Sequence, residues 1–201
     1  MRLYLVRHGE TDANRVLGHS VSGPAHNEPV VFKEGDDTNI SLNVNGRRQA
    51  KECVQQLPEK IDKIYSSRLI RAKETAEIIL TTKGLDISTV EFRDELAEYR
   101  QGSLEGFSSD QKKEKSGPGG WGSGLMCDYD YTPWGGDSWK TIYDRLVSLF
   151  AKLKDSGIEN AILVTSGGPI RMTYKILLSE KSPGIQKHIM IKNGTVHEFI
   201  I

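Results

Sequence analysis

The alternation of short apolar runs with helical patterns constrains the fold of this chain most strongly. Apolar runs at Leu3–Val6, Ile61–Tyr65 and Ala161–Val164 each end in a polar turn, as buried parallel strands do. Between them, apolar residues recur at spacings of three and four, most clearly from Trp139 to Leu153, a stripe that ends before Gly157. The alternation predicts an α/β domain with a mostly parallel sheet, whose ligand crevice lies beyond the carboxyl ends of the strands.

The chain has 201 residues, and we expect a single domain over residues 1–201. Two stretches, at about 19–41 and 108–135, lack a clear period and are predicted to be long loops. The second loop contains Gly117–Gly120 and two tryptophans, which favour a lid or a pocket wall.

Charge and cysteine content exclude several classes of protein. There are 27 basic and 27 acidic residues, so no net field marks a nucleic-acid or membrane-surface binder, and any anion site must be small. Cys53 and Cys127 form no CxxC pair, which indicates a reducing compartment and no structural zinc. No apolar run approaches the ~20 residues of a membrane span. A cytoplasmic protein is expected.

Two motifs follow directly on predicted strands. Arg7-His8-Gly9-Glu10-Thr11 places an imidazole and a guanidinium at a strand end, as suits a nucleophile that faces a bound anion. Ser66-Ser67-Arg68, followed by Arg71, stands at a predicted helix start, where guanidinium donors and free amides favour phosphate.

Two further motifs complete the predicted site. Glu98 lies in a loop between central elements, where a carboxyl group could protonate a leaving oxygen, although a solvated loop charge is the alternative. Thr165 to Arg171 is a glycine-bearing turn from a strand into a helix, which presents amides to an anion. Asp137 precedes the long apolar stripe and is expected to cap that helix.

In this order the motifs resemble those of the histidine phosphatase superfamily, in its phosphoglycerate mutase-like branch. The resemblance covers nearly the whole chain and implies a three-layer α/β/α sandwich with a mostly parallel central sheet. The matching positions are Arg7–Thr11, Leu42, Gly46, Gln49, Ala50, Ser66–Arg68, Arg71, Ala72, Thr75, Ala76, Leu96, Glu98, Gly102, Glu105, Gly106, Gly136–Ser138, the turn before Arg171, and Asn193.

The resemblance also implies a mechanism. His8 would attack phosphorus and form a phosphohistidine that water hydrolyses, and Glu98 would act as general acid and then as base. The residues expected to hold the phosphoryl group are Arg7 and Arg68, helped by Asn14, Thr11 and Gly167.

No metal or other cofactor is required by this mechanism. Metal ligation by His8, His19 and His26 is the alternative for these imidazoles, but their spacing matches no metal template and the arginines would repel a cation.

The sequence departs from the family pattern at Ser166, where the family normally has a second histidine before the paired glycines. A serine hydroxyl cannot bring positive charge to the phosphoryl group, and loss of such a donor typically costs ~10²–10³ in rate. Three interpretations stay open. Ser166 marks a slower phosphatase in which His19 or His26 supplies the charge, a protein that binds phosphorylated ligands without turnover, or an engineered substitution.

We therefore predict a phosphomonoester hydrolase that acts on a small phosphorylated metabolite. The alternatives are a non-catalytic module that binds phosphorylated ligands, and a mutase-type phosphotransferase. The mutase is less favoured because Glu28, Glu34, Asp36 and Asp37 in the first loop do not look like a second phosphate site. Substrate identity and oligomeric state do not follow from the sequence.

Overall fold

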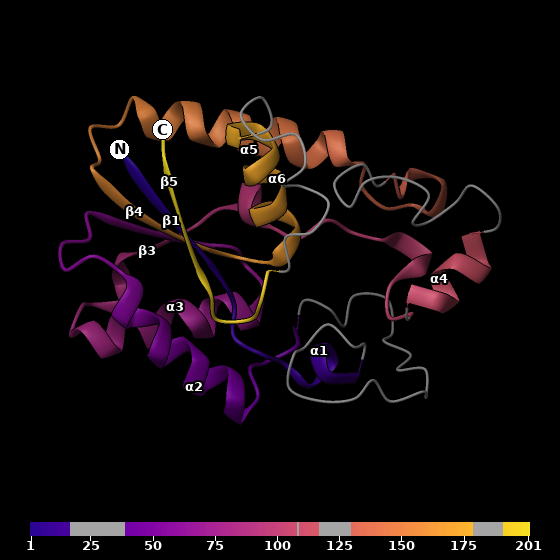
Figure 1. The fold of residues 1–201 in the computed structure, drawn as a ribbon, viewed down its shortest axis with the longest axis horizontal. Coiled ribbons are helices and arrows are strands. Elements are labelled where there is room, and N and C mark those ends of the chain that lie inside the picture. Colours follow the sequence, from indigo (N-terminus) through magenta and orange to yellow (C-terminus); the bar gives the residue numbers. More distant parts are fainter. Residues whose placement is uncertain (17–38, 108, 117–129, 179–190) are drawn as a thin grey trace.

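The computed structural model describes residues 1–16, 39–107, 109–116, 130–178 and 191–201, and helices and strands alternate along them (Figure 1). The strands are β1 (Arg2–Arg7), β2 (Lys63–Ser66), β3 (Val90–Phe92), β4 (Asn160–Thr165) and β5 (Val196–Ile200). The α-helices are α1 (Asp12–Val16), α2 (Val44–Glu52), α3 (Ile70–Lys83), α4 (Ser109–Ser116), α5 (Trp139–Lys154) and α6 (Gly167–Leu178). Short 3₁₀ helices are η2 (Cys53–Gln56), η3 (Ile87–Thr89), η4 (Asp94–Leu96), η5 (Gly102–Leu104) and η6 (Thr132–Trp134).

The five strands form one sheet in the order β3-β2-β4-β1-β5. The pairs β1 with β4, β4 with β2 and β2 with β3 are parallel. Strand β5, at one edge of the sheet, runs antiparallel to β1. Arg7 pairs with Thr165, and Ser66 pairs with Val164. The residues that follow β1, β4 and β2 therefore leave the sheet side by side, at the end where the carboxyl ends of these strands lie.

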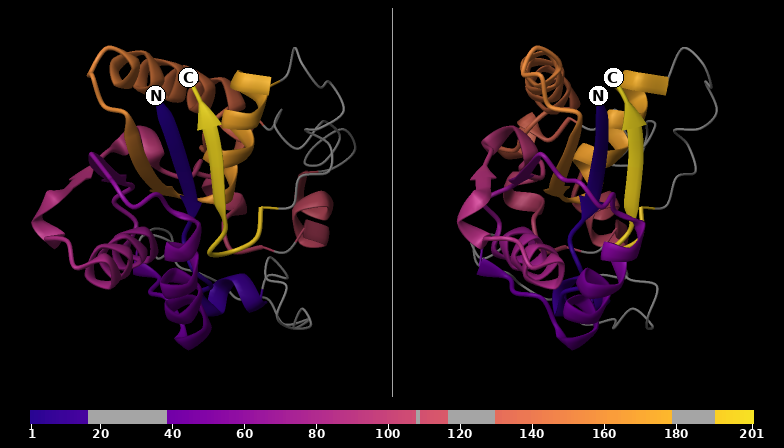
Figure 2. Two further views of the ribbon diagram at one scale, coloured as in Figure 1. Left: turned by 60° about the vertical axis from the view of Figure 1, so that its left-hand side comes forward. Right: turned by 90° about the vertical axis from the view of Figure 1, so that its left-hand side faces the viewer.

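Two helix layers cover the sheet, with α5 and α6 on one face and α2 and α3 on the other (Figures 1 and 2). Successive side chains of a strand point to opposite faces. Accordingly Leu3 and Leu5 belong to the core cluster that includes α5 residues, whereas Tyr4 and Val6 pack in the cluster that includes α3 residues. The predicted three-layer α/β/α sandwich with a mostly parallel sheet is confirmed.

The apolar stripe of α5 forms its buried face. Its buried residues are spaced by three and four, and the helix begins after Ser138, whose side chain accepts a hydrogen bond from the Thr141 amide. The buried residues are Ile142, Leu146, Leu149, Phe150 and Leu153.

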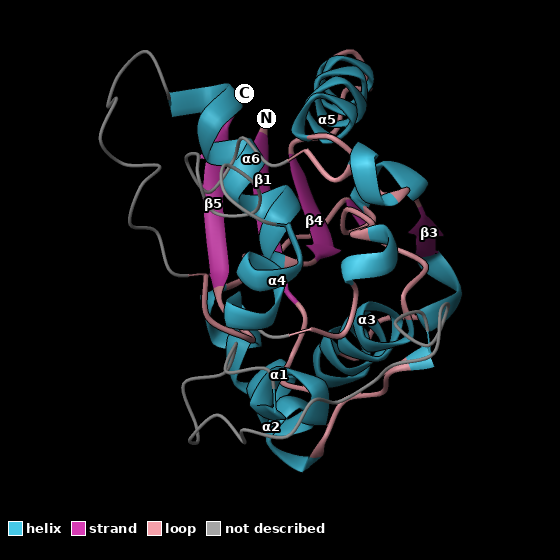
Figure 3. Cartoon of the chain, turned by 90° about the vertical axis from the view of Figure 1, so that its right-hand side faces the viewer, coloured by secondary structure: helices cyan, strands magenta, loops and turns pink. Residues whose placement is uncertain are grey.

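The prediction of a long loop over 108–135 is wrong in part, because residues 109–116 form α4 and residues 132–134 form η6. The sequence of α4 contains no apolar residue, so no apolar period could indicate a helix, although lysine, glutamine and glutamate favour one. Figure 1 shows α4 to the right of the two helix layers, and Figure 3 views the molecule from that side. Residues 117–129 and most of the other predicted loop, 17–38, lie outside the described residues.

Within the described parts of the chain, no helix is long and apolar enough to cross a membrane.

Candidate active site

His8 leaves the carboxyl end of β1 and is buried, with 3% of its surface exposed. Its Nδ1 lies 2.7 Å from the carbonyl oxygen of Gly9, and its Nε2 lies 3.2 Å from Nε of Arg71. A carbonyl oxygen only accepts and a guanidinium only donates hydrogen bonds. Nδ1 therefore bears the proton, and Nε2 presents a lone pair to the arginine.

The surroundings of His8 favour this neutral imidazole. Burial lowers the pKa of His8 well below its usual range, and the positive charges of Arg71 and Arg7 lower this pKa further. The hydrogen bond to the Gly9 carbonyl acts in the opposite direction but is the smallest of the four effects. A neutral imidazole with an unprotonated Nε2 is the nucleophilic form.

Arg7 is the second cation at this edge of the sheet. The residue is 8% exposed, and its guanidinium donates from Nη1 to the carbonyl oxygen of Ile191, while Nε has no hydrogen-bond partner among the described residues. The pKa of Arg7 is lowered to about 10. Burial is the largest cause, and the positive charge of Arg171 is the second. Arginines held close together out of water indicate an anion site.

Arg71, and not Arg68, is the arginine that reaches His8. Arg68 lies before α3, with a side chain 62% exposed whose Nε donates to Asp94 Oδ1 at 2.8 Å. Arg71 lies in the first turn of α3 and is buried. The expected placement of Arg68 is therefore corrected. Arg71 and Thr75 are one helical turn apart, beside the buried Ala72 and Ala76. This spacing in the sequence could have identified Arg71 as the arginine on the buried face of the helix.

Thr75 and two glycines hold the backbone around His8. The Thr75 hydroxyl accepts a hydrogen bond from the Gly9 amide and donates to the Arg71 carbonyl oxygen. A Cβ at Gly9 would lie 2.2 Å from the carbonyl oxygen of Gly46 in α2. Only glycine permits this approach, which explains the need for both glycines in the motifs.

Glu98 follows η4, and its carboxylate contacts the N-terminus of α6. Its Oε2 accepts a hydrogen bond from the Gly168 amide at 3.0 Å, and its Oε1 accepts one from the Tyr99 amide. A Cβ at Gly168 would lie 2.0 Å from Oε1, so glycine is required for the carboxylate to approach the helix start. The predicted carboxylate and the predicted glycine turn are thus brought together.

Ser166 joins β4 to α6 and is 2% exposed. Its neighbour Thr165 accepts a hydrogen bond from the His8 amide, so Ser166 and His8 leave adjacent strands together. Ser67, which follows β2, donates its amide to Val164 on the other side of β4. Neither the Ser166 nor the Ser67 hydroxyl has a hydrogen-bond partner among the described residues. Buried hydroxyls without partners are costly unless a ligand satisfies them.

Thr11 and Asn14 stand at the start of α1, where the amide of each donates to the side-chain oxygen of the other. Asn193 donates from Nδ2 to Asn14 Oδ1 and to the His8 carbonyl oxygen. Asn14 is thus tied to the His8 backbone through Asn193. Gly167, the last predicted phosphate-binding residue, is the first residue of α6.

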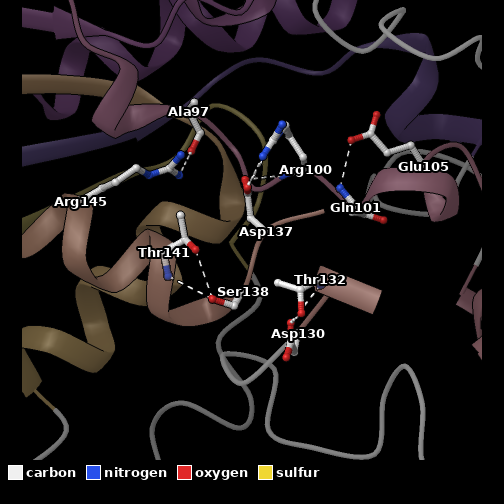
Figure 4. A network of polar contacts seen from close by, with 10 residues as sticks. All are labelled: Ala97, Arg100, Gln101, Glu105, Asp130, Thr132, Asp137, Ser138, Thr141 and Arg145. Atoms are coloured by element: carbon white, nitrogen blue, oxygen red, sulfur yellow. Dashed lines mark hydrogen bonds and ion pairs between the residues drawn. The ribbon is translucent and has the colours of Figure 1, made fainter. Parts of the chain in front are cut away.

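Asp137 does not cap α5 as the sequence suggests, because Ser138 takes that position. Both Asp137 carboxylate oxygens instead accept hydrogen bonds from Arg100, from its backbone amide and its guanidinium (Figure 4). Burial raises the pKa of Asp137, but the hydrogen bonds and charge of Arg100 outweigh burial and lower it overall. This contact fastens the segment after Glu98 to the start of α5.

Metal ligation cannot be assigned to the described residues, which contain no group of three or more His, Cys, Asp or Glu side chains able to hold an ion. His19 and His26, which the metal alternative and the charge-compensation interpretation both invoke, lie outside the described residues.

Comparison with known proteins places these observations in a family. The sequence profile of the histidine phosphatase superfamily (branch 1) matches residues 3–201. A phosphoglycerate mutase-like protein of Arabidopsis thaliana is 31% identical over 98% of this chain and 78% of that protein. A broad-specificity phosphatase of Saccharomyces cerevisiae is 25% identical over 100% of this chain and 80% of that protein.

Solved structures agree with these sequence matches. The mycobacterial glucosyl-3-phosphoglycerate phosphatase in complex with VO3 superposes with a TM-score of 0.74 and 25% identity. The match covers 98% of this chain and 91% of the mycobacterial chain.

Proposed function

Because the chain belongs to the histidine phosphatase superfamily (branch 1), we propose that it hydrolyses a small phosphomonoester through a phosphohistidine at His8. The observation that supports this most directly is that each ring nitrogen of His8 has its own contact. Its Nδ1 donates to Gly9, and its Nε2 lone pair lies beside the Arg71 guanidinium. That pattern suits an in-line attack by Nε2 on a phosphorus atom whose oxygens contact arginine.

The first step transfers the phosphoryl group to His8. Nε2 forms a bond to phosphorus while the bond between phosphorus and the ester oxygen breaks, and the departing oxygen receives a proton from the Glu98 carboxyl group. Arg7 and Arg71 neutralise the charge on the remaining phosphoryl oxygens in the transition state. The Ser166 and Ser67 hydroxyls and the amide at the start of α6 would add donors.

The second step returns the enzyme to its starting state. Glu98 is now a carboxylate and removes a proton from water, whose oxygen attacks phosphorus as the bond to Nε2 breaks. Inorganic phosphate leaves, His8 recovers its neutral form, and Glu98 is again protonated. The position of Glu98 against the Gly168 amide supports this assignment, since it holds the carboxyl group at the same helix start as Ser166.

A binding module that does not turn over phosphorylated ligands is the second candidate. It is favoured by one observation, the buried Ser166 hydroxyl that stands where the family normally has a charged imidazole donor. Phosphoglycerate mutase activity is a third possibility, in keeping with the name of the Arabidopsis relative. It requires transfer of the phosphoryl group to a second hydroxyl instead of water.

Steady-state assays separate these candidates. Hydrolysis of p-nitrophenyl phosphate and of a panel of phosphorylated metabolites is measured for the unsubstituted protein, for His8→Ala and for the control variant Arg68→Gln. The panel includes 3-phosphoglycerate with a bisphosphoglycerate primer, to detect mutase activity. We expect phosphate release that His8→Ala abolishes and Arg68→Gln leaves within about twofold, since Arg68 is exposed and paired with Asp94.

Two other results would reject the proposal that the protein is a hydrolase. Isomerisation of the phosphoglycerate without phosphate release would identify a mutase. Binding of phosphorylated ligands with no turnover by any of the proteins would identify a binding module.

A further inference from the structure

A third guanidinium, that of Arg171, lies close to the proposed phosphate site, and the mechanism above does not use it. We propose that Arg171 contacts the transferring phosphoryl group and supplies the positive charge that Ser166, in the position of the family's second histidine, cannot supply. This inference rests on the proposed function and assigns a further residue to the same site.

The position of Arg171 supports the proposal through helix geometry. Arg171 lies four residues after Gly167, on the same face of α6, and side chains on a helix lean toward its N-terminus. A Cβ at Gly167 would lie 3.5 Å from Nη1 of Arg171. The guanidinium therefore returns to the first residue of the helix, directly after Ser166.

Two positive charges close to Arg171 favour the binding of a further anion there. The N-terminus of a helix is the positive end of its dipole, so a guanidinium there is repelled by the helix itself. Arg7 is close enough that the charge of Arg171 lowers its pKa more than the charge of Arg71 does. A phosphoryl group with two negative charges would relieve both repulsions.

Glu98 offers the competing explanation. Its carboxylate also lies at the start of α6, and Arg171 could serve only to hold it there. The two roles differ in one respect. If Arg171 only positions Glu98, its loss should cost the same whether residue 166 is serine or histidine. If Arg171 replaces the missing imidazole charge, restoring histidine should make Arg171 largely dispensable.

A double-mutant cycle tests this difference. The four proteins are the unsubstituted one, Arg171→Gln, Ser166→His, and the double variant. Lys175→Gln is the matched control, since it removes the same charge from the same helix at a residue whose ammonium lies over the Trp139 ring. Affinity for inorganic phosphate is measured by calorimetry, and kcat for p-nitrophenyl phosphate is measured alongside.

With serine at position 166 we expect Arg171→Gln to weaken phosphate binding and to lower kcat by about 10²-fold, as for loss of one charged donor. In the Ser166→His background the same change should cost about threefold or less. Ser166→His alone should raise kcat by about tenfold, because Arg171 already supplies part of the charge. Arg171→Lys should recover part of the loss, and Lys175→Gln should change neither quantity by more than about twofold.

Equal losses in the two backgrounds would overturn the proposal and leave Arg171 as a positioning residue for Glu98. Phosphate binding that is unchanged by Arg171→Gln would overturn it as well. These outcomes are distinct from failure of the proposed function, which would appear as no phosphate release or as hydrolysis that does not depend on His8. The phosphate-binding cycle would still decide the role of Arg171 in an inert protein.

Discussion

Arg71 Nε donates a hydrogen bond of 3.2 Å to His8 Nε2, the nitrogen that is free to attack phosphorus. The contact orients the lone pair in the resting site and places a guanidinium where the phosphoryl oxygens must arrive. Because a ligand would take over the donor, the same residue can serve the free and the bound states.

Replacing Arg71 should therefore disable the site. We expect Arg71→Gln to lower kcat/KM for p-nitrophenyl phosphate by about 10²–10³-fold, because one charged donor to the transition state is lost. Arg68→Gln is the matched control three residues away, and should stay within about twofold. The comparison is made by initial rates with proteins checked for folding by circular dichroism. A larger effect for Arg68 than for Arg71 would contradict the assignment.

The loss of Glu98 should depend on the leaving group. p-Nitrophenolate departs without a proton, so Glu98→Gln should cost p-nitrophenyl phosphate about tenfold or less, whereas an alkyl phosphate should lose about 10²–10⁴-fold. Glu95→Gln serves as the control, since Glu95 pairs with Lys152 and not with the start of α6. Equal losses with both substrates would show that Glu98 does not act as the acid.

The buried His8 should make folding stability depend on pH. Its pKa is lowered by burial and then by Arg71 and Arg7, whereas the unfolded chain has the usual value near 6.5. Below about pH 6.5 the unfolded chain therefore binds a proton at His8 that the folded protein does not bind. The free energy of unfolding is highest above about pH 6.5 and decreases as the pH falls below that value.

Urea unfolding of the natural protein and of His8→Gln at pH 7 and pH 5 isolates this contribution. The free energy of unfolding of the natural protein should fall relative to that of the variant by up to about 2 kcal/mol between the two pH values. His197, whose pKa burial also lowers, is present in both proteins and cancels from the difference. A difference that stays constant with pH would mean that His8 is readily protonated in the folded state.

The contact between Gly9 and Gly46 should be intolerant of a side chain. Gly9→Ala would place a methyl group 2.2 Å from a backbone oxygen, and we expect a loss of about 3 kcal/mol in the free energy of unfolding. Gly84→Ala meets open space, so only its positive φ of 69° opposes the change, at about 1 kcal/mol. Denaturant unfolding of both variants provides the comparison, and a Gly9 variant as stable as the Gly84 variant would refute it.

The parts of the fold that the sequence predicted are those with a repeating apolar pattern. The buried strands β1, β2 and β4 and the stripe of α5 follow directly from that pattern, and with them the edge at which His8 and Ser166 meet. The polar helix α4 contains no apolar residue and gave no such signal.

The site was predicted less completely than the fold. The sequence motif contains both Arg68 and Arg71, and which of them reaches the site depends on where α3 begins. Arg68 precedes the helix, whereas Arg71 lies in its first turn. Asp137 resembles a capping residue, yet only the tertiary contact with Arg100 shows what its carboxylate binds. Such assignments depend on distances between segments far apart in the chain.

The central claim is that a phosphoryl group is bonded to His8 during turnover. Rapid-quench mixing with a ³²P-labelled phosphomonoester that the steady-state panel identifies as a substrate, followed by peptide mass spectrometry, tests it most directly. We predict a label on the peptide that contains His8, lost in acid, stable in alkali and absent from His8→Ala. Hydrolysis at the full rate by His8→Ala, or a label on a different residue, would contradict the account.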